Sequence, residues 1–346
     1  MDAKMAKRRR LPGVIAAGLM IVVTLLWTFW GTAEMYHEGW WGSWMNRLPY
    51  LAPMAVCLLP TIVGITWPLV GGLIILGLSV FTLFFFGSNL FFFYVPAAIV
   101  GILFVMDGIN RRRHPEVFVR VGPWWRRRLL YLLALGGTLV VVIAVSAVNL
   151  PIVLARVDDG ERGARLIEGN GVSLIWAPEG PGWNFVQPWG GFPSWQSVAL
   201  YDVEPVGLDD KPGYVWGSSD FAYAAAEDMM DGSLCSYLSE DGLTLMDERQ
   251  EIWRMPTADE IVRSLVHHGE NAGCTWDGVV GQQVTCEQRP DKESPLWSTD
   301  HAAIYYWAAD SYDERLAVFV SYNGWVNSTH KTSGNPRHSY RCVREP

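Results

Sequence analysis

The sequence predicts a protein of two parts, a bundle of five transmembrane helices followed by a water-soluble α+β domain. Three observations predict this. Long uncharged apolar runs are confined to residues 1–149. The charge balance reverses, from 13 Lys and Arg against 5 Asp and Glu in residues 1–149 to 14 against 30 in residues 150–346. Four of the five cysteines lie in the second part. The two parts are therefore expected to face different solvents, lipid and water.

The uncharged runs set the number of spans. Residues 11–30 form one run, and a helix that rises about 1.5 Å per residue crosses a hydrocarbon core of about 30 Å in 20 residues. Residues 48–106 are uncharged over 59 positions, which suits three helices with breaks near Trp67-Pro68 and Gly87-Ser88-Asn89. Residues 129–148 supply a fifth. We predict a transmembrane region over residues 1–150, with spans near 11–30, 48–67, 69–87, 89–107 and 129–149.

Arginines and lysines set the expected orientation. They precede the first predicted span and the last one, and positive segments stay in the cytoplasm. These basic residues are Lys4, Lys7, Arg8, Arg9, Arg10, Arg111, Arg112, Arg113, Arg120, Arg126, Arg127 and Arg128. Both segments are inside only if an even number of spans separates them, so three helices in residues 48–106 fit. We expect a multi-pass protein of the cytoplasmic (inner) membrane, with its N-terminus inside and residues after 150 outside.

The alternative for the first segment is a cleaved signal peptide, which also begins with basic residues and an apolar run. We favour a retained span because 20 apolar residues are long for a signal core and no small-x-small cleavage site follows. Trp27 and Trp30 are typical of interfacial anchors.

The cysteines agree with the orientation. Cys57 falls in a predicted span and is expected to act as a small apolar residue. The other four lie in the outer part, where an oxidising compartment permits disulfides, and they allow three connectivities. These are Cys235, Cys274, Cys286 and Cys342. Free thiols or a zinc site are the alternatives, but no C-x-x-C pair is present.

Local patterns predict the elements of the soluble part. Residues 151–169 are expected to form a polar stalk and residues 171–176 a strand, before a Pro/Gly-rich stretch to residue 191. Residues 221–230 favour a helix. Thr257 and Glu260 form a capping box that begins a second helix, expected to end near residues 267–269. Further strands are expected at residues 302–307, 316–322 and 340–343, with a turn at residues 323–324. This is an α+β pattern.

Several polar groups suggest chemistry only weakly. His267, His268 and Glu270 suggest a metal site, but adjacent histidines at a helix end more often meet terminal carbonyls. His37 and Glu38 suggest an ion site, although an interfacial turn is favoured. The interiors of the predicted spans carry no charge, which argues against a transporter or channel. The acidic outer part argues against a nucleic-acid partner.

Four ordered motifs in residues 170–344 resemble a bacterial domain of unknown function. They are Cys235-Ser236-Tyr237-Leu238, Ile252 to Ile261 around Trp253-Arg254-Met255-Pro256-Thr257, Tyr306-Trp307-Ala308-Ala309, and Tyr340-Arg341-Cys342-Val343-Arg344. The corresponding family motifs read Y-C-x-x-L, W-R-L-P-T-x-x-E-L, Y-W-S-S-T and R-C-V-R. The family is related to the C-terminal domain of the collagen-like adhesin Lcl and, more broadly, to formylglycine-generating enzymes and C-type lectins. The chain departs from it at Ala308-Ala309, in the acidic insertion 239–250, and at Cys274 and Cys286.

The resemblance implies a C-type-lectin-like fold for residues 170–346. It also implies that Cys235 pairs with Cys342 and Cys274 with Cys286. The motif residues are Trp253, Arg254, Pro256, Thr257, Glu260, Arg341 and Cys342.

The function expected from the resemblance is recognition without catalysis, of a glycan, an envelope component or a protein. Aromatic side chains suit sugar faces and protein hot spots, and the candidate contacts are Trp297, Tyr305, Tyr306, Trp307, Tyr322 and Trp325. We expect two or three of them to be exposed and the others to belong to the core. No cofactor is expected. Calcium is a weaker hypothesis that rests on acidic residues in the same region, Asp291, Glu293, Asp300, Asp310, Asp313 and Glu314.

Two other functions stay open at this stage. One is a copper oxidoreductase of the formylglycine-generating type, which needs a second cysteine near Cys342. In the other, the membrane half is the functional unit and the outer domain senses for it. The oligomeric state is not predicted.

Overall fold

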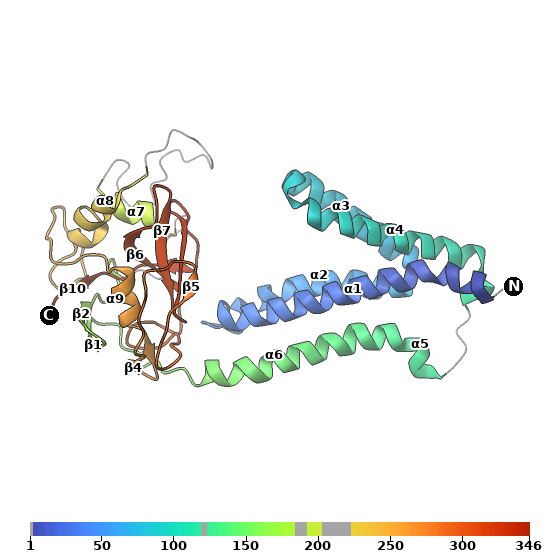
Figure 1. Ribbon diagram of the computed structural model, residues 1–346, viewed down its shortest axis with the longest axis horizontal. Coiled ribbons are helices and arrows are strands. Elements are labelled where there is room, and N and C mark those ends of the chain that lie inside the picture. Colours follow the sequence, from blue (N-terminus) through green and yellow to red (C-terminus); the bar gives the residue numbers. More distant parts are fainter. Residues whose placement is uncertain (1–2, 119–122, 184–191, 203–222) are drawn as a thin grey trace. The chain divides into compact units, whose positions relative to one another are not determined.

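The computed structural model describes residues 3–118, 123–183, 192–202 and 223–346 (Figure 1). The chain divides into two compact units, Met1–Leu154 and Ala155–Pro346, and each is described by itself. We call the second unit the C-terminal domain.

The first unit is helical. Its helices are α1 (Ala3–His37), α2 (Ala52–Thr66), α3 (Pro68–Phe86), α4 (Phe91–Arg113), α5 (Trp124–Tyr131) and α6 (Gly137–Leu154), with a π-helical turn (Leu132–Gly136) joining α5 to α6. Short 3-10 turns cover Trp44–Asn46, Leu48–Leu51, Gly87–Leu90 and Pro115–Phe118.

Among the described residues of this unit, five segments are long and apolar enough to cross a membrane. They are Arg8–His37, Trp44–Thr66, Pro68–Phe86, Phe91–Arg113 and Arg128–Leu154. The breaks fall where the sequence predicted them, because Pro68 begins α3 and Gly87, with a φ of 67°, follows its last residue. The prediction of five apolar helices is confirmed. Helix α1 continues beyond the predicted end of the first span, residue 30, as far as His37.

Small and hydroxyl side chains bring these helices together. Helix α1 contacts α2, α4 and α6. Asp107 of α4 lies so close to Gly13 that a Cβ at this position would clash with its carboxyl group. The hydroxyls of Thr24 and Thr61 of α2 form a hydrogen bond of 3.1 Å. Such contacts let helix backbones approach closely where lipid gives no hydrophobic drive to association.

The described residues of the C-terminal domain form three sheets. A three-stranded sheet has the order β1 (Arg165–Gly169), β2 (Val172–Trp176), β10 (Val343–Arg344), and a hairpin joins β3 (Val266–His267) to β4 (Glu270–Asn271). The five-stranded sheet has the order β5 (Gln282–Gln283), β8 (Trp325–His330), β7 (Leu316–Ser321), β6 (Tyr305–Ser311), β9 (His338–Ser339). Its helices are α7 (Trp195–Ala199), α8 (Ala226–Asp231) and α9 (Ala258–Arg263), with a 3-10 turn at Leu234–Tyr237.

Two cores cover opposite faces of the five-stranded sheet, because successive side chains of a strand point to opposite sides. On one face Val318, Val320 and Tyr306 pack with Ile261 of α9. On the other face Ala317, Phe319 and Trp307 pack with Trp195 of α7, Met229 of α8 and Cys342. The α+β class is confirmed.

The predicted stalk at residues 151–169 is wrong. Helix α6 continues to Leu154, residues 165–169 form β1, and the segment between them lies against the C-terminal domain. The buried Arg156 guanidinium forms an ion pair of 2.8 Å with Asp291 and donates to the Tyr322 hydroxyl. Burial alone would raise the pKa of Asp158, but hydrogen bonds from Arg162 and Thr299 lower it well below its usual value. The segment looked like a polar linker because its partners lie more than 130 residues away.

Other boundaries differ as well. The capping box of Thr257 and Glu260 begins α9 as predicted, but the helix ends at Arg263, whose carbonyl accepts a hydrogen bond from Asn271. His268 and Gly269 have positive φ and form the turn of the β3–β4 hairpin, which replaces the predicted helix end. Helix α8 begins at Ala226, and part of the predicted helix at 221–230 lies outside the described residues. Strand β6 covers 305–311 instead of 302–307. Of the predicted last strand at 340–343, only Val343 lies in a sheet, as the first residue of β10.

Candidate functional site

One face of the five-stranded sheet carries a row of side chains that crosses all five strands. Gln283 of β5 pairs with Trp325 of β8, and Tyr305 of β6 pairs with both Ser321 of β7 and His338 of β9. The β7–β8 register, in which Val320 faces Val326, sets Ser321 opposite Trp325. Because paired residues share a face, these five form what we call the cross-sheet row.

The cross-sheet row combines exposed and buried groups. Trp325 is 40% exposed and Gln283 is exposed, whereas Tyr305 is half-buried. Ser321 is 1% exposed, and its hydroxyl has no hydrogen-bond partner among the described residues. An aromatic platform beside a hydroxyl that lacks a partner is suited to binding a ligand with both apolar and polar faces.

His338 closes the row at β9. Its ring stacks on Trp307 at a centroid distance of 4.5 Å and lies about as close to Tyr305 and Phe319, at 5.0 and 5.1 Å. Within the described part of the chain neither ring nitrogen has a hydrogen-bond partner. Burial lowers the pKa of His338 from 6.5 to about 4, so the imidazole is neutral at pH 7.

The His338 imidazole makes the C-terminal domain sensitive to acid. The unfolded chain binds a proton at His338 below pH 6.5 and the folded chain does so only near pH 4. The contribution to stability is therefore complete above pH 6.5 and falls by about 3 kcal/mol as the pH drops to 4. We expect His338→Phe to remove this loss. The check is the difference in free energy of unfolding between wild type and variant at pH 7 and pH 4, and a difference that does not change with pH would contradict the prediction.

The six predicted aromatic contacts divide between the two faces of the sheet. Tyr305 and Trp325 lie in the cross-sheet row and keep exposed surface. Trp307 is on the same face but fully buried. The other three, Trp297, Tyr306 and Tyr322, belong to the core on the opposite face.

These buried side chains have structural partners instead of a ligand. Tyr306 stacks on Trp297 at 3.7 Å, accepts a hydrogen bond from Trp183 and donates one to the Leu296 carbonyl. Two of the six candidates therefore remain available as contacts.

The weak calcium candidates have other partners. Asp310 accepts a hydrogen bond of 2.6 Å from the Ala258 amide at the start of α9, and burial raises the pKa of its carboxyl. Asp313 accepts from the amides of Arg315 and Leu316 in the β6–β7 turn.

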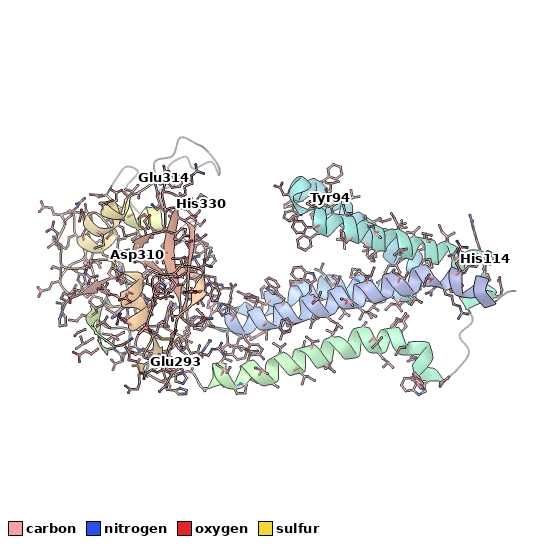
Figure 2. All side chains as sticks on the ribbon, in the orientation of Figure 1. Tyr94, His114, Glu293, Asp310, Glu314 and His330 are labelled. Atoms are coloured by element: carbon pink, nitrogen blue, oxygen red, sulfur yellow. A yellow bond between two sulfur atoms is a disulfide. The ribbon has the colours of Figure 1, made fainter. Side chains whose placement is uncertain are left out.

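The remaining acidic candidates do not converge. Asp291 pairs with Arg156, and Glu293 lies 3.6 Å from His268. Figure 2 shows Glu293 and Glu314 at opposite ends of the C-terminal domain. Among the described residues, no three His, Cys, Asp or Glu side chains group closely enough to hold a metal ion. This includes His267, His268 and Glu270 of the β3–β4 hairpin.

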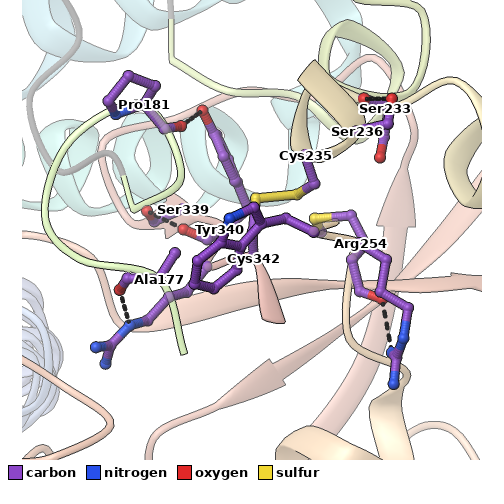
Figure 3. Close-up of a disulfide and its surroundings, with 12 residues drawn as sticks. Ala177, Pro181, Ser233, Cys235, Ser236, Arg254, Ser339, Tyr340 and Cys342 are labelled. Atoms are coloured by element: carbon purple, nitrogen blue, oxygen red, sulfur yellow. Dashed lines mark hydrogen bonds between the residues drawn. A yellow bond between two sulfur atoms is a disulfide. The ribbon is translucent and has the colours of Figure 1, made fainter. Parts of the chain in front are cut away.

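Both disulfides pair as the sequence resemblance implied. Cys235 joins Cys342 across 107 residues (Figure 3), and Cys274 joins Cys286 across 12. The fifth cysteine, Cys57, lies in α2. Since the sequence has no other cysteine, the C-terminal domain has no free thiol in this structure.

The motif residues around the first disulfide are structural. Trp253 is buried in the core, and Arg254 forms ion pairs with Glu260 at 2.7 Å and with Glu345 at 3.0 Å. The Pro256 carbonyl accepts a hydrogen bond from the Ala309 amide.

Arg341 is a buried cation that joins three segments. Its guanidinium donates to the carbonyls of Ala177, Pro295 and Leu296 at 2.8 to 2.9 Å, and it lies 3.5 Å from the centre of the Trp183 ring. Burial lowers its pKa to about 9, and no carboxylate pairs with it within the described residues. Its partners are backbone groups, so its role is to hold these segments together.

Sequence reasoning did not find Gln283, Ser321 or His338. The signal for Ser321 was present, because the turn at residues 323–324 fixes the hairpin register and strand alternation then puts Tyr305, Ser321 and Trp325 on one face. Nothing local indicated β5 and β9, which are two residues long.

Comparison with known proteins gives one family. Residues 5–116 match a domain of unknown function (DUF7670). No curated protein and no solved structure matches the chain. The matched segment is less than half of the chain and covers α1 to α4, so it gives no support to the resemblance seen in residues 170–344.

Proposed function

We propose that this protein is a membrane-anchored recognition module that binds a glycan, an envelope component or a protein outside the cytoplasm, without catalysis. The observation that carries the proposal is the cross-sheet row. It presents an exposed tryptophan and a half-buried tyrosine next to the buried Ser321 hydroxyl, which has no hydrogen-bond partner among the described residues. The polar groups around it have no catalytic arrangement, since His338 is neutral and enclosed by aromatic rings.

The proposed location rests on two features. Disulfides persist in oxidising compartments, and both pairs lie in the C-terminal domain. The two arginine runs meet at one end of the helical unit, where the Asn110 amide donates to the Arg9 carbonyl at 3.2 Å. Positive ends stay inside, which favours a cytoplasmic N-terminus and delivery of the C-terminal domain to the outer side by α6 in a bacterial cytoplasmic membrane.

The finer proposal for the fold is a C-type-lectin-like domain. The nested disulfide order and the four sequence motifs support it. The copper-oxidoreductase alternative is disfavoured, because it needs two thiols and Cys342 is in a disulfide.

Trp325→Ala tests the binding face. With full-length protein in nanodiscs screened against glycan arrays and envelope extracts, we expect the variant to lose at least tenfold in affinity for any ligand that wild type binds, since aromatic anchors carry much of the binding energy. Tyr312→Ala is the matched control, because Tyr312 is 55% exposed and lies beyond the opposite end of β6. Equal binding by both variants would remove the cross-sheet row as the site.

A further inference from the structure

We propose that the arginine-rich ends of α1 and α4 form a binding site for the phosphate group of an anionic phospholipid. The site, which we call the arginine collar, consists of Arg8, Arg9 and Arg10 of α1 with Arg112 and Arg113 of α4.

Direct contacts hold the two halves of the collar together. The Asn110 side chain donates to the Arg9 carbonyl at 3.2 Å, and Arg10 donates to the carbonyl of Val117. The guanidinium groups of Arg10 and Arg111 both lie near the Phe118 ring, at 6.0 Å and 5.5 Å from its centre. Residues 100 positions apart in the chain therefore form one surface.

Four of the five collar arginines have no acidic partner among the described residues. Arg111 forms an ion pair of 2.9 Å with Asp107. Because this pair neutralises its charge, Arg111 is not counted in the collar. Within the described residues, Arg8, Arg9, Arg112 and Arg113 form no ion pair, and three of these four are exposed. Like charges on neighbouring arginines repel one another, so we expect a bound anion to stabilise the collar.

Arginine side chains favour phosphate as that anion. The guanidinium presents parallel N–H donors whose spacing matches two phosphate oxygens, and it stays charged at any physiological pH. Two arginine runs together provide enough donors to surround a phosphodiester.

The depth of the collar favours a lipid as the source of the phosphate. Arg8 begins one candidate span and Arg113 ends another, which puts the collar at headgroup level when these helices cross a bilayer. Exposed apolar side chains follow at once on the same two helices, where acyl chains would lie. These are Leu11, Val14 and Ile15 of α1 and Met106 and Ile109 of α4. A soluble phosphate would use the arginines but gain nothing from this apolar surface.

Native mass spectrometry of the full-length protein in a neutral detergent tests the proposal. The probes are short-chain phosphatidylglycerol, phosphatidylcholine with the same acyl chains, and inorganic phosphate. We expect phosphatidylglycerol to bind and Arg112→Gln/Arg113→Gln to weaken its binding about 25-fold, at about fivefold per arginine. The matched control, Arg289→Gln/Arg315→Gln, removes two exposed arginines from the C-terminal domain and should bind like wild type.

A charge-preserving variant separates binding from folding. Arg112→Lys/Arg113→Lys should keep most of the affinity, and all variants should keep the helical content of wild type. Equal binding of the two lipids, or equal binding by the Gln variant and its control, would overturn the site. Displacement of phosphatidylglycerol by inorganic phosphate at the same concentration would overturn the lipid as its ligand.

Discussion

Replacing both Cys235 and Cys342 by alanine is expected to lower the free energy of unfolding of the C-terminal domain by about 4–5 kcal/mol. The disulfide joins positions 107 residues apart, and a crosslink that closes a long loop removes the most freedom from the unfolded chain. Both cysteines are buried in the core that also contains Trp253 and Tyr340.

Hydrogen exchange measured on β6 and β7 of the full-length protein in increasing denaturant gives this free energy. The matched control is Cys274→Ala/Cys286→Ala, whose loop spans only 12 residues and for which the same argument gives about 3 kcal/mol. If the short-loop variant were the less stable of the two, the chain-entropy explanation would be wrong.

Arg341→Ala is expected to destabilise the C-terminal domain by about 3–5 kcal/mol. The substitution removes the Arg341 donor from the buried carbonyls of Ala177 and Pro295, at about 1–3 kcal/mol for each group before relaxation, and leaves a void beside Trp183. The Leu296 carbonyl loses one of its two donors and keeps the Tyr306 hydroxyl. Arg341→Lys should recover only part of this, because one ammonium does not reach three carbonyls in the geometry of a guanidinium.

The same exchange experiment measures the effect of Arg341. The control is Arg289→Ala, which removes an exposed arginine that follows β5 in the sequence. It should change the free energy of unfolding by no more than about 0.5 kcal/mol. A loss at Arg341→Ala no larger than this control would show that the buried guanidinium does not hold the three segments together.

The helical unit could be predicted from the sequence because the length of an uncharged run is a local property of the chain. Bilayer thickness fixes the length of an uncharged run, so the five candidate spans and the breaks at Pro68 and Gly87 could be predicted, although some helices extend up to seven residues beyond the predicted ends. The arginine runs predicted an even number of spans between them, which agrees with the contact between Arg9 and Asn110. Orientation in a bilayer still rests on the charge rule.

The C-terminal domain followed less completely because its contacts are long-range. Local signals such as the capping box of Thr257 and Glu260 held where they were complete. The order β5-β8-β7-β6-β9 joins strands that are not consecutive, and β10 pairs with β2 from the start of the domain. No local pattern reveals that Arg156 pairs with Asp291, or that Asp310 caps α9 instead of binding a cation.

The candidate site shows the same division. The aromatic composition of residues 297–325 predicted that some of these rings bind a ligand, and strand alternation decides which ones. Tyr305 and Tyr306 are neighbours in sequence but point to opposite faces of the sheet, so only Tyr305 belongs to the cross-sheet row with Trp325. His338 joins that row through a parallel pairing with β6 that spans more than 30 residues.

The central claim is that the C-terminal domain recognises a ligand and has no thiol chemistry. Intact mass of the full-length protein after thiol alkylation, with and without prior reduction, tests it most directly when combined with copper analysis. The account predicts one alkylated cysteine before reduction, Cys57, five after it, and no bound copper. Three alkylated cysteines before reduction, including Cys342, together with retained copper would contradict it and favour oxidation of a partner cysteine as the function.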